Sequence, residues 1–180
     1  MERRSFIQKT ALTTSAISLG GSLTFAKDST TNTKHNFNLK YAPHLGMFKH
    51  HAGDDPIDQL NFMADQGFTA FEDNGMRTRT VELQEKMAKT MTDRGLQMGV
   101  FVAHEIYWRE PNLASGDKAK REEFLDYIKK SIDVAKRVNA KWMTVVPGHV
   151  DLKLQPGYQR AHVIESLKQA SAILEPHGLV

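Results

Sequence analysis

Polar and apolar residues follow two alternating patterns along residues 39–180. Short apolar runs rich in β-branched and aromatic side chains are each followed by a stretch in which apolar residues recur every three or four positions. The first pattern is typical of a parallel strand buried on both faces, and the second is typical of an amphipathic helix. The runs that predict strands are 39–45, 68–72, 96–103 and 141–147, and residues 179–180 begin a fifth.

Helices are predicted between these strands. Asp55 and Pro56 form an N-terminal cap and first turn, and Gly67 ends the helix that they open. The other helical stretches are 80–94, which ends at Gly95, 118–138, and 159–177, which ends at Gly178. The chain therefore reads as successive strand–helix units.

The connections between these elements have unequal lengths. Each helix returns to the next strand through one or two residues, whereas each strand reaches its helix through a long polar loop. Long loops at the carboxyl ends of parallel strands are where α/β barrels place their sites. We therefore predict an α/β fold, a parallel (β/α)₈ TIM barrel of which about the first four units are present. A doubly wound open sheet is the alternative, but no glycine-rich phosphate loop follows the first strand.

Composition excludes several classes of function. The chain has 40% hydrophobic and 25% charged residues, as a soluble globular protein does, and it contains no cysteine for a disulfide or a thiolate site. Of the formal net charge of +3, the first 26 residues carry +2. The remaining charges of the two signs are interleaved, which gives no nucleic-acid-binding face.

The first 26 residues resemble a twin-arginine export signal. Arg3 and Arg4 are followed by Phe6 and then by a mildly apolar run that ends near Ala26. This run is too polar and too short for a comfortable membrane anchor. We expect export to the periplasm or beyond by the twin-arginine machinery, cleavage near Ala26, and a polar linker over residues 27–38.

The chain is shorter than a complete barrel of this type. A barrel of this type needs roughly 250 residues, and the chain has 180, with its last residues inside an apolar strand. An open half-barrel would expose strand edges and apolar surface. We expect this chain to be the N-terminal half of the barrel, over residues 39–180, and to be inactive alone.

Two stretches resemble a known family. Residues 144–180, TVVPGHVDLKLQPGYQRAHVIESLKQASAILEPHGLV, and residues 68–76, FTAFEDNGM, are similar to the hydroxypyruvate-isomerase-like branch of the xylose-isomerase-like sugar isomerase/epimerase superfamily. The resemblance rests on the order and spacing of several features.

That resemblance implies an aldose–ketose isomerase or epimerase of a small sugar or 2-keto acid, and a homo-oligomer is compatible with it. A divalent metal, Mn²⁺ or Mg²⁺ before Zn²⁺, would polarise the substrate while carboxylates move a proton through an enediol. The family's metal ligands are expected beyond Val180, so no residue of this chain is assigned as a metal ligand or as catalytic. The alternative is a non-catalytic carbohydrate- or polyol-binding protein on the same barrel.

Five residues at the predicted strand ends are candidates for substrate contact. His104 either binds a substrate oxygen or packs on Trp108, which itself either forms an apolar wall over the substrate or fastens the loop. Glu72 binds substrate or pairs with an arginine at position 77 or 79. The others are His149, with Asp151 as an orienting partner, and His44.

One pair of histidines resembles a metal-binding pair but lacks the spacing that metal ligands on a helix have. His50 and His51 are adjacent, whereas ligands on one helix face lie three or four residues apart. We interpret them as solvated loop residues. Met87 and Met91, at helical spacing, are interpreted as core residues.

Overall fold

The computed structural model describes residues 34–180. These residues lie within one compact unit that spans residues 32–180. The predicted export signal, with Arg3, Arg4, Phe6 and Ala26, lies outside the described residues, as does the first part of the linker. No helix among residues 34–180 is long and apolar enough to cross a membrane.

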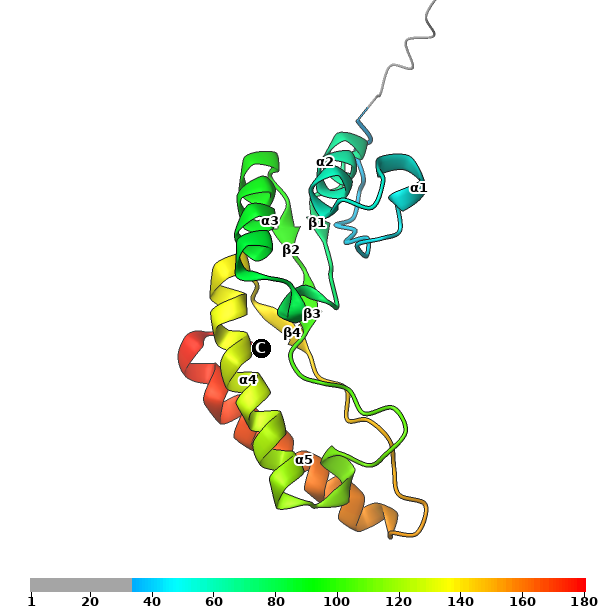
Figure 1. Ribbon diagram of the computed structural model, residues 1–180, viewed down its shortest axis with the longest axis vertical. Helices are drawn as coiled ribbons and strands as arrows, with labels where there is room; N and C mark the ends of the chain where they lie inside the picture. The colour runs from blue at the N-terminus through cyan, green and yellow to red at the C-terminus, as the bar shows by residue number, and fades with distance from the viewer. Residues whose placement is uncertain (1–33) are drawn as a thin grey trace, which may run out of the picture. The chain divides into compact units, whose positions relative to one another are not determined.

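Parallel strands in sequence order form the centre of the unit (Figure 1). In β1 (Ala70–Phe71), Ala70 pairs with Gln97 of β2 (Gln97–Met98). In β3 (Val100–Val102), Val100 pairs with Trp142 of β4 (Trp142–Thr144). Parallel neighbours in chain order are the arrangement that a barrel requires.

Backbone hydrogen bonds extend this order at both ends. His44 and Glu72 form a parallel bridge, so the segment before Leu45 lies beside β1 as the first strand. At the other end the Met143 amide donates to the Val180 carbonyl at 2.7 Å, and the Val180 amide donates to the Lys141 carbonyl at 2.9 Å. The predicted first strand is thus present only as a bridge at His44 and not over residues 39–45, and residues 179–180 begin to pair beside β4 as predicted.

Gly99 divides the predicted strand 96–103 into β2 and β3. Met98 and Phe101 are both buried although they are three residues apart, so the alternation of faces shifts between them. A glycine at a bulge explains the shift, because a Cβ at Gly99 would lie 3.0 Å from the carbonyl oxygen of Phe71.

In Figure 1, α3 (Val81–Arg94) and α4 (Lys118–Val138) lie on one side of β2, β3 and β4, and α2 (Pro56–Gln66) lies above β1. The predicted positions of these three helices are confirmed. The fourth, α5 (Pro156–Leu174), begins three residues before the predicted start, because Pro156 occupies its first turn. The short η3 (Glu175–His177) continues it to Gly178.

The helix ends follow from local chemistry. The Asp55 carboxylate accepts a hydrogen bond from the Ile57 amide at 2.7 Å and so caps α2. Gly67 ends the helix at φ 97°, and a Cβ there would lie 2.0 Å from the carbonyl oxygen of His35. Only glycine allows both this backbone conformation and this close approach.

Three short helical turns were not predicted. They are α1 (Lys49–Ala52), η1 (Met76–Thr78) and η2 (Leu113–Ser115), and each lies in a loop that follows a strand. Each has fewer than five residues, too few for a periodic apolar pattern to reveal them.

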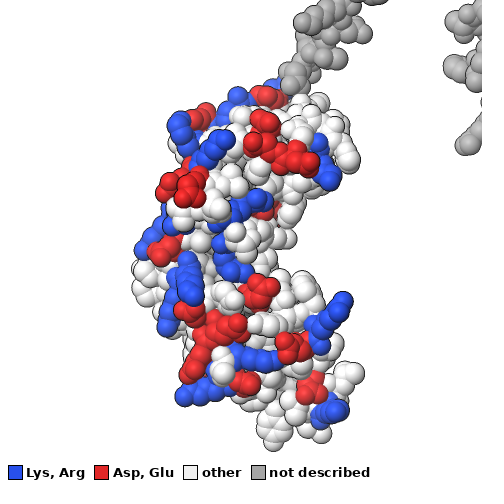
Figure 2. Space-filling view, viewed as in Figure 1, with Lys and Arg blue, Asp and Glu red and all other residues white. Residues whose placement is uncertain are grey.

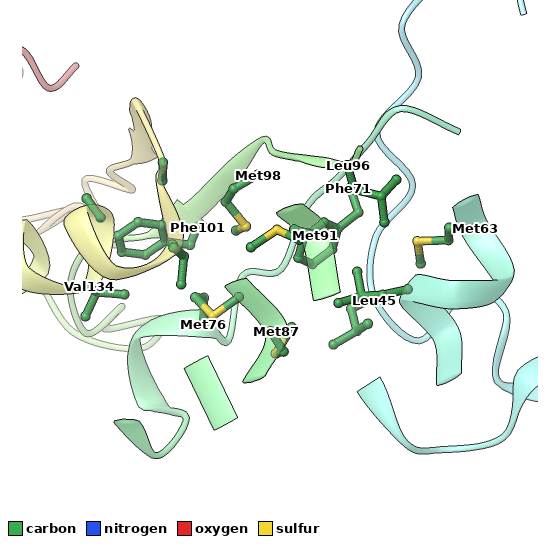
Figure 3. Packing of buried hydrophobic residues seen from close by; sticks show 14 of the residues in the cluster. Leu45, Met63, Phe71, Met76, Met87, Met91, Leu96, Met98, Phe101 and Val134 are labelled. Carbon is green, nitrogen blue, oxygen red and sulfur yellow. The ribbon is translucent and has the colours of Figure 1, made fainter. Parts of the chain in front are cut away.

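The core lies between strands and helices and is rich in methionine. Figure 3 shows the side chains of Met76, Met87, Met91 and Met98 packed together beside Phe101. The interpretation of Met87 and Met91 as core residues is confirmed. Unbranched, polarisable thioethers fill irregular gaps between a strand layer and its helices.

The predicted burial of the strands on both faces is wrong for these residues. Phe71 and Phe101 are fully buried against the helices, but Trp142 on β4 is 50% exposed and Val100 and Val102 are half-buried. The strands therefore have a helix-covered face and an inner face that residues 34–180 leave partly open.

Candidate functional site

Glu72 lies at the end of β1, on the inner face. Side chains alternate along a strand, and its neighbour Phe71 is buried in the core beneath the helices. A Cβ at Gly99 would lie 3.7 Å from the Cβ of Glu72, which places the glutamate beside the Gly99 bulge. The half-buried carboxylate of Glu72 has no hydrogen-bond or ion-pair partner among the described residues.

The two arginines considered as partners for Glu72 pair with other acids. Arg79 contacts the Asp73 carboxylate twice, from Nε at 2.5 Å and from Nη2 at 3.2 Å. Arg77 donates to Glu105 at 3.1 Å and lies over the ring of Tyr127, 4.7 Å from its centroid. The salt-bridge alternative for Glu72 is therefore wrong.

Asp73 is the residue at this edge that sequence reasoning missed. Its side chain is 3% exposed, and it also accepts a hydrogen bond from the Gly75 amide at 3.1 Å. The signal was the Asp-Asn-Gly turn directly after the strand, in which an aspartate commonly bonds the backbone two residues on. Asp73 thus fixes the loop that follows Glu72.

His104 is turned toward α4 rather than toward the inner face. It is 2% exposed, and its ring meets the ring of Phe124 edge to face, with the centroids 5.1 Å apart. Nδ1 lies 2.6 Å from the Glu105 carbonyl oxygen, and Nε2 lies 3.0 Å from the Val146 amide nitrogen. Burial lowers the pKa of His104 below its ordinary value of 6.5, and the carbonyl of Glu105 partly opposes this.

The structural alternative for His104, packing on Trp108, is wrong. Trp108 is 70% exposed, in the loop between β3 and α4, and the aromatic partner of His104 is Phe124. The next residue back, Tyr107, fastens this loop to α4, because its hydroxyl donates to both carboxylate oxygens of Glu123 at 2.9 and 3.0 Å. The substrate-contact role of Trp108 stays a prediction.

His44 lies at the bridge beside β1, and His149 lies in the loop after β4. The Nδ1 atom of His44 lies 2.6 Å from the Leu45 carbonyl oxygen. His149 is exposed and pairs through its backbone with Pro111, while the Asp151 carboxylate accepts from the Lys153 amide at 2.8 Å. Among the described residues, Asp151 makes no contact with the side chain of His149, although this contact was expected. Substrate contact by His44 or His149 stays a prediction.

The adjacent histidines His50 and His51 lie in α1 and are exposed. The ring of His51 stacks on Phe62 of α2 at 5.6 Å between centroids. Their interpretation as loop residues needs this correction, because they form a short helical turn that packs on aromatic side chains.

No cluster of three or more His, Asp or Glu side chains within residues 34–180 has the geometry of a metal site. The described residues therefore do not fit the expected divalent ion, and we derive no chemical step from a metal here.

A cavity of about 620 Å³ lies between the loop after β4 and the start of α5. Its lining is mainly apolar and includes Val150, Leu152, Leu154 and Val163. None of the five predicted substrate-contact residues lines it. We place the candidate site at the strand ends, where the polar groups are, rather than in this cavity.

Comparison with known proteins assigns the family. Residues 60–180 match the model of the xylose isomerase-like TIM barrel. The chain belongs to this family. No protein with a curated description matches the chain.

Solved structures show the same fold at low sequence identity. An AP endonuclease of family 2 from Brucella melitensis is 17% identical with a TM-score of 0.60, over 78% of this chain and 53% of that one. The D-psicose 3-epimerase with D-tagatose from Clostridium cellulolyticum H10 is 12% identical with a TM-score of 0.61, over 78% and 50%. The 3-keto-D-glucoside 4-epimerase YcjR from E. coli is 18% identical with a TM-score of 0.59, over 79% and 54%.

These similarities confirm the predicted TIM-barrel fold, and the family match confirms the xylose-isomerase-like part of the resemblance. The chain spans about half the length of these solved structures. The charges on the face drawn in Figure 2 are of both signs and intermixed, as the sequence predicted.

Proposed function

We propose that the chain forms part of the substrate-facing wall of an isomerase or epimerase that acts on a small sugar or 2-keto acid. Its family and the epimerases among its structural neighbours support this reaction class. The resemblance described above further favours the hydroxypyruvate-isomerase-like branch. A divalent metal, Mn²⁺ or Mg²⁺ before Zn²⁺, is part of the proposal and would be bound by residues outside this chain.

Glu72 is the observation that carries the proposal. It offers a half-buried carboxylate at a strand end, on the inner face and without a partner among residues 34–180. A carboxylate in that position can accept hydrogen bonds from substrate hydroxyls. Trp108 and His149 are exposed in loops that leave the same edge, and they complete the proposed substrate wall.

The test measures exchange of the substrate α-proton with deuterated solvent by the full-length protein, with Mn²⁺ or Mg²⁺ added. A panel of sugars and keto acids, including hydroxypyruvate, supplies the substrate. We expect metal-dependent exchange, and we expect Glu72→Gln to lower kcat/KM about tenfold or more, as loss of a charged hydrogen bond does. Glu175→Gln, in η3 at the opposite end of the strands, is the control and should leave exchange unchanged.

Three outcomes separate the hypotheses. Exchange that Glu72→Gln does not alter would remove Glu72 from the wall but keep the enzyme. Saturable binding of a panel member without exchange would favour the alternative, a non-catalytic carbohydrate- or polyol-binding protein. Neither binding nor exchange over the panel would overturn the proposal.

We also propose that the full-length protein is exported through the twin-arginine route. The paired arginines at positions 3 and 4 support this. Replacing both by lysine keeps the charge and should retain the protein in the cytoplasm, as fractionation of cells would show. Unchanged export of this variant would contradict the proposal.

A further inference from the structure

His104 joins two strand ends that lie side by side. His104 lies two residues after β3, and its ring accepts a hydrogen bond from the amide of Val146, two residues after β4. Pro147 follows Val146 and has no N–H, so Val146 is the last backbone donor before the turn. The hydrogen bond to His104 therefore fixes the point at which the strand becomes the loop.

The geometry of this contact determines the protonation state of the ring. A backbone N–H can only donate, so Nε2 must carry no proton in order to accept from Val146. A carbonyl oxygen can only accept, so Nδ1 must carry the proton that faces the Glu105 carbonyl. Both bonds exist together only in the neutral ring with its proton on Nδ1.

The two loops beyond His104 remain in contact. Pro111 and His149 form a parallel bridge between the β3–α4 loop and the β4–α5 loop. Gly148 has φ 83°, and a Cβ there would lie 3.1 Å from the carbonyl oxygen of Tyr107. The bond from Val146 to His104 is thus followed by further contacts between these two loops, which run side by side in Figure 1.

We propose that His104 is a positioning residue that holds the β4–α5 loop against the β3–α4 loop only while its ring is neutral. Protonation of the ring at Nε2 removes the acceptor for the Val146 amide and places two donors against each other. The segment from Val146 to His149 then loses its attachment to β3. This inference concerns loop attachment and does not rest on the proposed catalytic activity.

The surroundings of His104 set the pH range. Burial is the first cause of its lowered pKa, and the positive charge of Arg77 in η1 acts in the same direction. The carbonyl and carboxylate of Glu105 oppose both. The contacts from α4 and from the end of β4 are the Phe124 ring and the Val146 amide, neither of which titrates. The loop should therefore stay attached at neutral pH and detach in acid, below 6.5.

The experiment measures amide hydrogen exchange in the 180-residue chain, with protection corrected for the intrinsic pH dependence. Ala103 is the internal control, because its amide donates to the Thr144 carbonyl at 3.1 Å between the same two strands, without a histidine. As the pH falls from about 7 through the lowered pKa of His104, protection of Val146 relative to Ala103 should fall about fivefold, the equivalent of one lost hydrogen bond.

A second measurement and two variants make the test specific. Nitrogen NMR of the His104 ring at neutral pH should show the proton on Nδ1. His104→Gln has a side-chain amide that does not titrate, so the Val146 to Ala103 ratio should become independent of pH. His44→Gln, at the corresponding strand end, should leave that dependence as in the wild type.

A proton on Nε2 would overturn the proposal, and so would a Val146 protection that follows that of Ala103 at every pH. A pH dependence that persists in His104→Gln would assign the effect to another group and overturn it as well. If His104→Gln does not fold, the tautomer and the wild-type ratio decide the question by themselves.

Discussion

The ends of the first and third strands share one arrangement in different surroundings. At each end a histidine Nδ1 lies 2.6 Å from the carbonyl oxygen of the following residue. At the third strand, Nε2 of the buried His104 lies 3.0 Å from the Val146 amide. At the first strand, Nε2 of the half-buried His44 lies 3.5 Å from the exposed Asn74 amide.

The difference shows that burial, more than residue type, decides what a strand-end histidine does. In water a longer hydrogen bond such as that of His44 competes with solvent, and its net contribution is small. In the buried site of His104, loss of the acceptor would leave an unpaired amide, which is costly. The loop after β1 is held instead by Asp73 and Arg79.

The largest expected effect tests whether Asp73 and Arg79, and not His44, hold the loop after β1. Asp73→Ala removes a 3% exposed carboxylate and leaves Arg79 without its partner. We expect a loss of about 3 kcal/mol in the free energy of unfolding, as for other broken buried ion pairs. Urea denaturation measures it. Glu110→Ala, which breaks the more exposed pair with Lys120, is the control and should cost less than about 1 kcal/mol.

A small effect of Asp73→Ala would mean that His44 or the η1 turn holds this loop. In that case His44→Ala, in the background of Asp73→Ala, should become more costly than in the wild type. A double-mutant cycle separates the two contributions.

Sequence reasoning reached the fold because the fold depends on repeated features. Apolar periodicity, the caps at Asp55 and Gly67, and the short returns from helix to strand each point to the same strand–helix repeat. It located all five candidate residues in loops or at strand ends. Sequence reasoning failed for contacts that depend on the direction in which one particular side chain points.

His104 is the clearest such case. Strict alternation from Phe101 would place it beside Val102 on the inner face, whereas its ring lies against Phe124 of α4. The backbone irregularity after β3 that turns the ring has no marker in the residues themselves. The Gly99 bulge did have one, since an isolated glycine within a strand commonly indicates a bulge.

The second prediction compares the two histidines directly. His104→Ala should lower the free energy of unfolding by about 2 kcal/mol, because it removes a buried ring and leaves the partly buried Val146 amide without its acceptor. His44→Ala should cost less than about 1 kcal/mol, because water can replace its contact with Asn74. Urea denaturation at neutral pH measures both, and equal costs would contradict the role assigned to burial.

The third prediction adds pH to this comparison. The folded-state pKa of His104 lies below its unfolded value of 6.5, so the unfolded chain takes up its proton first. The contribution of His104 is complete above pH 6.5 and is lost as the pH falls toward the folded-state pKa. The free energy of unfolding of the wild type should therefore decrease more between these values than that of His104→Gln. Parallel curves for the two proteins would refute this.

The smallest effect concerns Tyr107, which fastens the same β3–α4 loop from the solvent side. Its hydrogen bond to Glu123 raises its pKa to about 12. The sign is opposite to that of His104. The folded state holds the Tyr107 proton more tightly, so the contribution of Tyr107 to stability is present below pH 10 and disappears as the pH rises toward 12.

Glu123→Gln should return the pKa of Tyr107 toward 10. Phenolate absorbance measures this pKa, and Tyr107→Phe identifies the part of the absorbance that comes from Tyr107. Because this contact is exposed, stability at neutral pH should change by less than about 0.5 kcal/mol. A larger loss would show that Tyr107 and Glu123, and not only His104, hold the loop.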